Sequence, residues 1–322
     1  MIILTARLKP LATVQLTSET GRSLPEVFPL KDIPRIEASP DDYRLIERVP
    51  FTKPDAIFPL TLHPAAGDER PFVVADVETT GLDTEADSII ELGLVRGEYS
   101  PREARITSIT SALSRFEDPG KPIPTEITQI TGITDADVAG QRIDEEEIST
   151  WFEGDPLVIA HNAQFDRPMM DRRFGFLAER GWACTASGIP WRALGYEGRK
   201  LEYLLLKHGY FYGGHRAEVD CLATAWLMHI NQAAFAELLI SARQRTVVIR
   251  AFGAPFDVKD TLKAKGYRWH SGEKGPNKGW WTEVDANAVE EEQAFLNATY
   301  SLGAERAHYE PQTARTRFKG TK

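Results

Sequence analysis

The chain has 322 residues, 42% of them hydrophobic, and a formal net charge of −9 at pH 7. This length allows two domains or one large one, and the acidic balance argues against a protein that wraps nucleic acid by charge alone. No apolar run reaches the length of a membrane span, and the apolar stretch in MIILTARLKP is too short for a secretory signal. Cys184 and Cys221 lie in apolar surroundings without CxxC spacing, so we expect buried thiols and a cytoplasmic protein.

The charge is spread unevenly along the chain. Residues 71–240 carry 15 Lys/Arg against 27 Asp/Glu, whereas residues 241–281 carry 9 against 3. An acidic region beside a basic one indicates separate units. We predict a proline-rich segment of unknown role, a main domain, a small basic and aromatic α+β domain, and a disordered tail, at residues 1–70, 71–240, 241–302 and 303–322.

Local patterns give the expected elements in chain order. Residues 1–70 hold nine of the twenty prolines and should be largely extended or irregular, with a strand pair near 2–8 and 13–16. In the main domain we expect strands at 72–78, 88–96, 104–114 and 156–160, and helices at 125–131, 143–153, 166–179, 200–208 and 216–230. In the small domain we expect strands at 246–251, 267–270 and 279–284, and helices at 258–265 and 286–296, the last capped by Asp285.

The short turns between the first three strands of the main domain indicate a meander in which one strand is antiparallel to its neighbours. The order of elements fits a mixed sheet with helices on both faces.

Carboxylates in three segments carry most of the functional information. Asp76 and Glu78 lie two residues apart at the end of an apolar run, so on a strand they share a face and repel each other unless a cation neutralises them. Oxygen ligands of this kind suit Mg²⁺ or Mn²⁺. A lone DxE is more often a strand end with solvated acids, but Asp166 follows in VIAHNAQFD and Asp220 in HRAEVDC.

The three segments together resemble the DEDDh branch of the DnaQ-like 3′→5′ exonucleases, the family of the proofreading epsilon subunit of bacterial DNA polymerase III. The resemblance covers about residues 71–235, with DxExTGL at 76–82, HNxxFD at 161–166 and HxAxxD at 215–220. The stretch IPTEITQITGIT at 123–134 also resembles the family, and none of the five defining positions is substituted. The resemblance implies a ribonuclease H-like fold, so the expected class is α/β and residues 71–240 are the expected exonuclease domain.

The resemblance also implies the chemistry. Two ions, Mg²⁺ or Mn²⁺, would be held by Asp76, Glu78, Asp166 and Asp220, with Asp76 bridging, and single-stranded DNA would lose nucleoside 5′-monophosphates from its 3′ end. His215 would be the general base, because imidazole titrates near neutrality. On one helix, His215 and Asp220 would point about 140° apart. We therefore expect His215 in the loop before the helix that carries Asp220.

Substrate contacts are also implied by the resemblance. The terminal nucleotide would meet backbone groups of Thr79, Thr80, Gly81 and Leu82, with Leu82 against its base. The next nucleotide would meet His161, Asn162 and Phe165, with Phe165 stacking. Core packing remains the alternative for Leu82 and Phe165.

The small domain interleaves cations with aromatic residues. Cations and rings together can hold a single strand by charge and stacking, and a core of tryptophans with solvated lysines outside is the alternative. The candidate clamp residues are Lys259, Lys263, Arg268, Trp269, Lys278 and Trp280. The FDVKDTLKAKGYRW…KGWW pattern resembles modules appended to other bacterial nucleases.

Two other functions stay open at this point. The catalytic residues are shared with exoribonucleases of the same superfamily, and partner binding would make the chain a proofreading or nucleic-acid-binding subunit of a polymerase. The tail carries no obvious clamp-binding peptide, and the extra basic domain favours a free-standing repair or processing nuclease.

Overall fold

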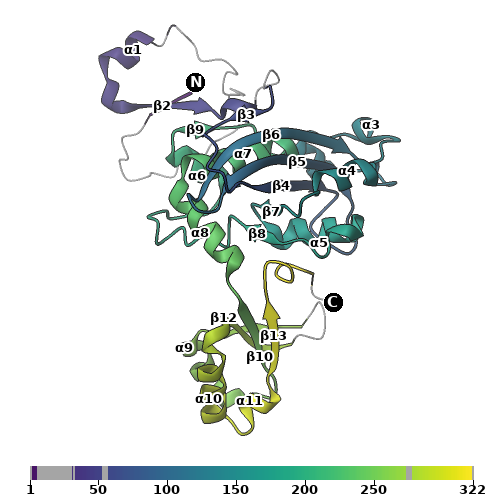
Figure 1. Cartoon of the computed structure of the whole chain (residues 1–322), viewed down its shortest axis with the longest axis vertical. Coiled ribbons are helices and arrows are strands. Elements are labelled where there is room, and N and C mark those ends of the chain that lie inside the picture. The colour runs from purple at the N-terminus through teal and green to yellow at the C-terminus, as the bar shows by residue number, and fades with distance from the viewer. Residues whose placement is uncertain (1, 6–30, 32, 53–56, 273–277, 321–322) are drawn as a thin grey trace, which may run out of the picture.

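The computed structural model describes residues 2–5, 31, 33–52, 57–272 and 278–320. Their strands form three sheets, the largest with six strands in the order β3-β6-β5-β4-β7-β8 (Figure 1). The strands of this sheet are β3 (Leu60–Thr61), β4 (Arg70–Thr79), β5 (Ile89–Ser100), β6 (Arg105–Phe116), β7 (Leu157–Ala160) and β8 (Trp182–Cys184). β5 is antiparallel to both β4 and β6, whereas β7 is parallel to β4 and β8. The expected mixed sheet is confirmed.

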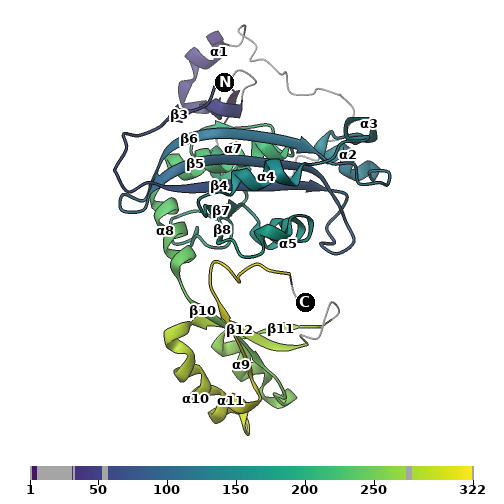
Figure 2. The same cartoon turned by 45° about the vertical axis from the view of Figure 1, so that its right-hand side comes forward.

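Helices cover both faces of the large sheet, as expected (Figure 2). One face packs on α4 (Glu145–Trp151) and α5 (Ala163–Arg173), and the other on α6 (Leu201–Lys207), α7 (Ala217–Ile230) and α8 (Gln232–Arg243). The short helices α2 (Thr125–Thr131) and α3 (Asp135–Val138) follow β6. Of the described residues, no helix is long and apolar enough to cross a membrane.

The sequence prediction gives other bounds for α5 and contains neither β8 nor α8, and the bounds of several other elements differ from it by a few residues. α5 begins three residues earlier and ends at Arg173, because Asn162 stands at its N-cap and a separate 3₁₀ turn covers 175–177. β8 is only three residues long, and its sequence WAC shows no alternation. α8 follows α7 after the single residue Asn231, which caps it through a bond from the amide of Ala234.

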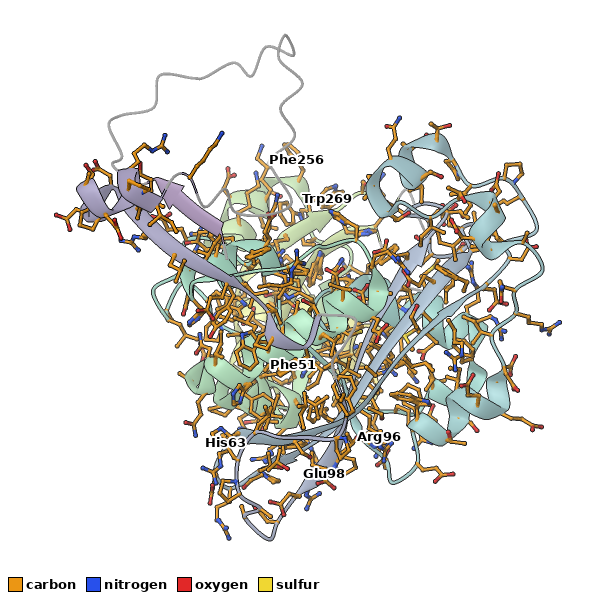
Figure 3. The ribbon with its side chains drawn as sticks, turned by 90° about the horizontal axis from the view of Figure 1, so that it is seen from above. Phe51, His63, Arg96, Glu98, Phe256 and Trp269 are labelled. Atoms are coloured by element: carbon orange, nitrogen blue, oxygen red, sulfur yellow. The ribbon has the colours of Figure 1, made fainter. Side chains whose placement is uncertain are left out.

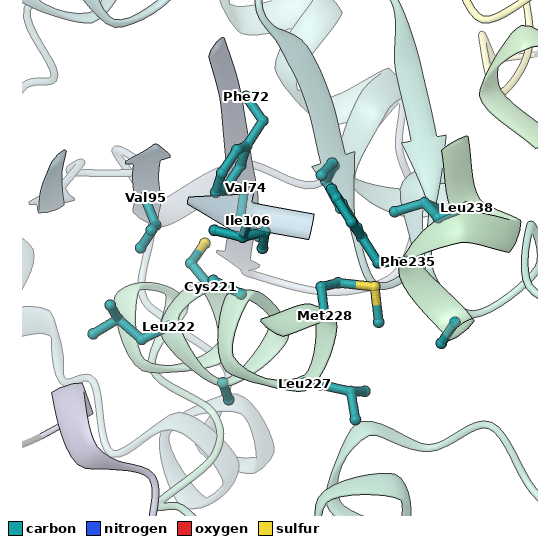
Figure 4. Packing of buried hydrophobic residues seen from close by; sticks show 14 of the residues in the cluster. Phe72, Val74, Val95, Ile106, Cys221, Leu222, Leu227, Met228, Phe235 and Leu238 are labelled. Atoms are coloured by element: carbon teal, nitrogen blue, oxygen red, sulfur yellow. The ribbon is translucent and has the colours of Figure 1, made fainter. Parts of the chain in front are cut away.

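The alternation of side chains along β4 decides where its acids point. Val73 packs with the α4–α5 cluster, whereas Phe72 and Val74 pack with α7 (Figure 4). Because side chains two apart share a face, Asp76 and Glu78 continue the Phe72 side toward α7. The buried thiol of Cys221, on α7, donates to Gly93 O at 3.3 Å on the neighbouring strand β5.

The N-terminal segment is tied to the region just before α7. β1 (Ile2–Thr5) pairs with β2 (Tyr43–Arg48), which pairs with β9 (Tyr210–Phe211), and α1 (Ile33–Ala38) precedes β2. We expected 13–16 to pair with the first strand; that stretch lies outside the described residues, and the strand that does pair with β1 is β2.

Within residues 246–272 and 278–312, four strands form an antiparallel sheet in the order β11-β12-β10-β13. Its elements are β10 (Thr246–Ala251), α9 (Lys259–Lys265), β11 (Arg268–His270), β12 (Gly279–Asp285), α10 (Val289–Thr299), α11 (Gly303–Arg306) and β13 (His308–Gln312). Asp285 accepts from the amide of Asn287 and caps a 3₁₀ turn that leads into α10. Figures 1 and 2 show this unit below the six-stranded sheet, joined to it through α8 and the returning C-terminal segment.

The prediction of a disordered tail at 303–322 is wrong for the described part, which runs to 320. α11 and β13 belong to the small sheet, and Ala314 O accepts from the amide of Trp182 at the end of β8. Arg167 of α5 donates to the main-chain carbonyls of Ala314, Arg315 and Arg317. These partners lie more than 130 residues away, so local periodicity in the tail carries no trace of them.

Candidate active site

Three carboxylates converge at the end of β4. Asp76 and Glu78 leave the strand toward α7, and Asp220 lies in the first turn of that helix. One oxygen from each of the three lies within 4.8 Å of the others. The sequence prediction that these acids meet is therefore matched by their positions, and an oxygen-only donor set suits a hard divalent cation.

Asp166 reaches the same place from the other side of the sheet. It lies in the first turn of α5, is 2% exposed, and its Oδ1 accepts from the amide of Val77 at 3.3 Å. Its Oδ2 is buried and has no hydrogen-bond partner within the described part of the chain. An unsatisfied buried carboxylate oxygen is costly, so this atom also fits a metal ligand.

Burial and mutual repulsion raise the pKa of all four acids. Burial is the larger cause, and it raises the pKa of Glu78 to about 8 and that of Asp166 to about 7, with neighbouring carboxylates adding to the effect. The pKa of Asp76 lies well above its usual value, and that of Asp220 is raised too. Cations bound here would relieve the repulsion and return these groups to their charged forms.

The guanidinium of Arg216 lowers the pKa of Glu78 less than burial and the neighbouring acids raise it, and it is held by a fifth acid. Glu91 stands opposite Glu78 on β5, is fully buried, and pairs with Arg216 at 2.9 Å. Glu91 also accepts from the amide of Ala217 at 3.2 Å and from the hydroxyl of Ser114 at 2.7 Å. This contact fixes the start of α7 on the sheet. Sequence reasoning missed it, although a lone acid inside the apolar stretch IIELGLV was a usable signal.

Tyr212 is a second contact that sequence reasoning missed. Its hydroxyl donates to Asp220 Oδ1 at 3.1 Å, while the amide of Arg216 donates to Oδ2 at 3.2 Å. Both oxygens of Asp220 are therefore oriented by the loop that precedes α7. The sequence offered no spacing signal for Tyr212, because the pairing depends on the path of that loop.

His215 lies in the loop before α7, as the helical geometry predicted. It is exposed, and its backbone has a positive φ of 67°. Non-glycine residues seldom adopt this conformation, and it is often found at functional sites. The imidazole acts on Asp220 electrostatically and favours its charged form, although burial raises the pKa of Asp220 more.

Residues 79–82 form a tight turn after β4. Thr79 donates its hydroxyl to Gly81 O at 2.6 Å, and Thr80 donates to Asp87 Oδ1 at 2.8 Å. Asp87 Oδ2 comes so close to Gly81 that a Cβ there would lie 2.4 Å from it, which explains the glycine without a substrate. Leu82 is 85% exposed, so core packing is excluded for it.

The HNxxFD residues divide between structure and surface. The Nε2 atom of His161 donates to Arg199 O at 2.9 Å and Nδ1 accepts from Thr185 at 2.8 Å, because a carbonyl can only accept. Burial lowers the pKa of His161 to about 4, so the ring is neutral and its nitrogens are occupied. Both nitrogens of His161 thus serve the fold, and any contact of this residue with a nucleotide would use the rest of the ring. Asn162 is exposed, and Phe165 packs on the core only in part.

The candidate clamp residues separate into two faces of the small sheet. Trp269 and Trp280 are cross-strand partners with ring centroids 5.4 Å apart, and Lys263 lies 5.9 Å from the Trp280 ring. Trp280 is 8% exposed and belongs to the core, as the alternative reading had it. Arg268 points to the opposite face, over Trp281 at 4.2 Å. Lys278 is exposed at the start of β12.

A cavity of about 610 Å³ lies at the opposite end of β4, beside Arg70 and Pro71, and none of the four carboxylates lines it. The carboxylate cluster is thus separate from this cavity.

Comparison with known proteins decides the family of the domain that carries these acids. Residues 73–228 match the family RNase T, described as Exonuclease. This segment is an exonuclease domain of the DnaQ-like family. The match contains all three motifs, and the divalent-metal chemistry general to the family agrees with the acidic cluster.

Curated relatives include bacterial DNA polymerases III of the PolC type. The chain is 38% identical over 105 residues to the polymerase of Halalkalibacterium halodurans, an alignment that covers 32% of this chain and 7% of that protein. It is 32% identical over 180 residues to the polymerase of Staphylococcus haemolyticus, with coverage of 52% and 12%. The chain therefore spans about a tenth of the length of these relatives.

Two solved structures show a weaker likeness to the chain. Exonuclease X in complex with 5′ overhanging duplex DNA has a TM-score of 0.39 and 24% identity, covering 53% of this chain and 99% of that one. Exonuclease I of E. coli, in complex with a 5cy-dT13 oligonucleotide, has a TM-score of 0.45 and 15% identity, covering 73% and 69%.

Proposed function

We propose that this chain is a metal-dependent 3′→5′ exonuclease that releases nucleoside 5′-monophosphates from the 3′ ends of single-stranded DNA. The observation that carries the proposal is the convergence of Asp76, Glu78 and Asp220, with the unpartnered Oδ2 of Asp166 nearby, inside an exonuclease domain. We propose DNA, and not RNA, as the substrate because the curated relatives are DNA polymerases.

The four carboxylates would hold two divalent cations, Mg²⁺ or Mn²⁺. Such a pair, when bound, supplies an activated water and stabilises the departing 3′ oxygen. Asp220 is held for this task by Tyr212 and by the amide of Arg216. Asp166 is held by the amide of Val77, which leaves its second oxygen for the ion.

His215 would accept the proton of the attacking water. It lies in a loop, and its imidazole has no hydrogen bond within the described residues, so the ring can turn toward the attacking water. Imidazole is also the side chain best matched to proton transfer at neutral pH. Hydrolysis then breaks the bond between phosphorus and the 3′ oxygen of the preceding nucleotide, and the released nucleotide keeps its 5′ phosphate.

The turn at 79–82 would receive the terminal nucleotide. The side chains of Thr79 and Thr80 are engaged within the turn, whereas the amides of Gly81 and Leu82 have no acceptor in the described residues. These amides are free to donate to the sugar, and exposed Leu82 can pack against the terminal base. Asn162 and Phe165 remain candidates for the next nucleotide.

The test is an assay on end-labelled single-stranded DNA, duplex DNA and RNA with products resolved by length. We expect stepwise shortening from the 3′ end of single-stranded DNA, loss of activity in EDTA, and recovery with Mg²⁺ or Mn²⁺. The Asp76→Ala protein should be folded and inactive. Full activity after chelation and dialysis contradicts the metal assignment, and faster shortening of RNA than of DNA replaces the proposed substrate with RNA.

A second candidate function is a proofreading subunit or module that works beside a polymerase. The alignments with PolC-type polymerases favour it. Faster removal of a mispaired than of a paired 3′ nucleotide from a primer–template would support this function over a free-standing repair or processing nuclease.

A further inference from the structure

The lysines of α9 point to two different sides of the small sheet unit. Lys265 faces α10, where it pairs with Glu291 at 3.2 Å and Glu292 at 3.7 Å. Lys259 and Lys263 are four residues apart and share the other side of α9. Neither forms an ion pair within the part of the chain that the structure describes, although Asp257 and Asp260 flank Lys259 in the sequence. Two cations without ion-pair partners among the described residues therefore remain on this side of α9.

Two exposed aromatic side chains, Phe256 and Trp269, belong to the same unit and are labelled in Figure 3. Phe256 is 80% exposed and Trp269 is 52% exposed. The Lys259 ammonium lies 4.1 Å from the centre of the Phe256 ring. Lys263 lies near Trp280, whose ring meets Trp269 edge-on, so α9 carries one lysine beside each of the two exposed rings or its neighbour.

These two rings are not needed to build the core of the unit. That core consists of residues such as Leu262, Tyr267, Trp280 and Leu296, and it includes neither Phe256 nor Trp269. Trp269 sits on β11, which is an edge strand of the sheet. Large exposed aromatic surface that does not serve the fold marks an interaction site.

We propose that the surface formed by Phe256, Lys259, Lys263 and Trp269, here called the α9–β11 patch, binds single-stranded nucleic acid. The two ammonium groups would contact phosphates, and the two exposed rings would stack on bases. A single strand fits better than a duplex, because ring faces can stack only on bases that are not already stacked in a helix. The choice of nucleic acid as the ligand rests on the proposed function.

The α9–β11 patch would offset the excess of negative charge in the exonuclease domain. Residues 71–240 carry 27 Asp/Glu against 15 Lys/Arg, so that domain repels a polyanion away from its metal site. A separate surface with free cations would hold the strand upstream of the 3′ end. Trp280, buried in the core, would support the patch and would not contact the strand.

The experiment measures binding of the full chain to a 5′-labelled oligothymidylate of about 30 nucleotides by fluorescence anisotropy. EDTA is present throughout, so no hydrolysis interferes. Two double variants are compared, Phe256→Ala with Trp269→Ala and Lys259→Glu with Lys263→Glu. The matched control is Arg142→Glu with Arg192→Glu, which makes the same charge change at exposed arginines outside the small sheet unit.

We expect the two kinds of variant to differ in their salt dependence. The aromatic double variant should raise Kd by about tenfold or more and leave the salt slope unchanged, since stacking does not release counterions. The lysine double variant should raise Kd and flatten the slope of log K against log salt by about 1.4, the value for two contacts to a single strand. Melting temperatures should stay near that of the unaltered protein, because the core is untouched.

Unchanged Kd and salt slope in both double variants would overturn the proposal. An equal effect of the control pair would also overturn it, since general electrostatics would then explain the loss. A change from dimer to monomer in the aromatic variant, measured by light scattering and without a change in DNA binding, would assign the patch to contact between copies of this chain instead. Because binding is measured without turnover, a chain that binds through the patch but hydrolyses no DNA contradicts only the proposed function.

Discussion

At the scale of single residues, the candidate site is a cluster of acids held close by bonds that do not neutralise them. Asp166 is fixed by an amide, and Asp220 by an amide and the Tyr212 hydroxyl. The guanidinium of Arg216, which offsets part of the charge on Glu78, is itself held by Glu91. The fold therefore holds these carboxylates close enough to repel one another, at the place where a divalent cation would neutralise them.

Burial of these acids, together with their mutual repulsion, predicts how stability depends on pH when metal is absent. The native state holds protons on Glu78 up to about pH 8, whereas the unfolded chain releases them near 4.5. The native state thus binds more protons in this window, so the stability from this group is lost as pH rises through it. The measurement follows the melting temperatures of the unaltered protein and of Glu78→Gln in EDTA as pH rises from 4.5 to about 8. The melting temperature of the unaltered protein should fall by several degrees more than that of the variant. A loss of about 1 kcal/mol lowers the melting temperature of a domain of this size by about 2–4 °C.

Mg²⁺ provides the control for this prediction. Added at the upper end of the window, it should raise the melting temperature of the unaltered protein more than that of Glu78→Gln. Parallel curves for the two proteins in EDTA would show that Glu78 ionises normally in the native state.

His215 gives a second prediction at this scale. His215→Ala removes the proposed base and leaves the four carboxylates in place, so kcat should fall by about 10²–10⁴-fold. Affinity for DNA and the metal concentration that gives half-maximal activity should stay close to the unaltered values. Near-normal turnover in this variant would mean that the cations activate the water without His215.

Sequence alone could predict the residues of the site that lie at fixed motif spacings. It placed Asp76 and Glu78 on one face of a strand and His215 in a loop, because both follow from backbone geometry. It could not predict that His161 is locked between Thr185 and Arg199, nor that Tyr212 orients Asp220. Those pairings depend on loop paths, which leave no periodic signal in the sequence.

At the scale of elements, the site depends on how closely α7 lies on the sheet. Gly93, opposite Asp76 on β5, has no side chain, and a Cβ there would lie 2.2 Å from the backbone of Ala217. Main-chain atoms cannot move aside as a flexible side chain can. The start of α7, and with it Asp220, is thus positioned by a glycine on a neighbouring strand.

Gly93→Ala should therefore affect both stability and activity. We expect a loss of about 1–3 kcal/mol, typical of overpacking, and a larger relative loss of activity because Asp220 is displaced from Asp76 and Glu78. Chemical unfolding and the exonuclease assay measure the two effects. Gly175→Ala is the control, because its added Cβ meets nothing within 4 Å. Equal activity of both variants would show that α7 adjusts without moving its carboxylate.

The elements that sequence could predict are those with strong local patterns. The apolar stripe of α7 and the alternation of β10 gave bounds within one residue of those observed. β8 is too short to show a pattern, and α8 follows α7 with no glycine or proline between them. β13 forms only because β10 offers it a partner, so a sequence reading of the tail missed it.

At the scale of the whole molecule, the C-terminal segment joins the two main sheets. Arg317 donates to Ser241 O at 2.9 Å and to Gln244 O at 3.0 Å, where α8 leads into the small sheet. Arg167, next to the metal-site candidate Asp166, is fully buried and donates to four main-chain carbonyls, three of them in this segment. A segment far from the carboxylates in sequence therefore supports the helix that carries one of them.

Removal of that segment should take hydrogen-bond acceptors away from a buried charge beside the site. A chain that ends at Gln312 keeps β13 but lacks the carbonyls of Ala314, Arg315 and Arg317, so Arg167 retains Asp171, Ala178 O and the Trp182 ring. Leaving a buried charge without its partners costs about 3–5 kcal/mol. We expect a loss of that size in chemical unfolding, together with reduced exonuclease activity because the first turn of α5 shifts. A chain that ends at Phe318 keeps all three carbonyls and should match the full chain.

Arg167→Met distinguishes this cause from a general loss of contacts. Arg167→Met has no buried charge to leave unpaired. Truncation at Gln312 should therefore destabilise this variant by about 2 kcal/mol less than it destabilises the unaltered protein. This difference lies within the usual range of coupling between contacting groups. Equal losses in the two backgrounds would assign the stabilisation to other contacts of the segment, such as Arg317 with Gln244 O and Arg315 with Asp155. In that case the tail would act as a brace between the sheets, and its removal would lower stability without a specific effect on Asp166.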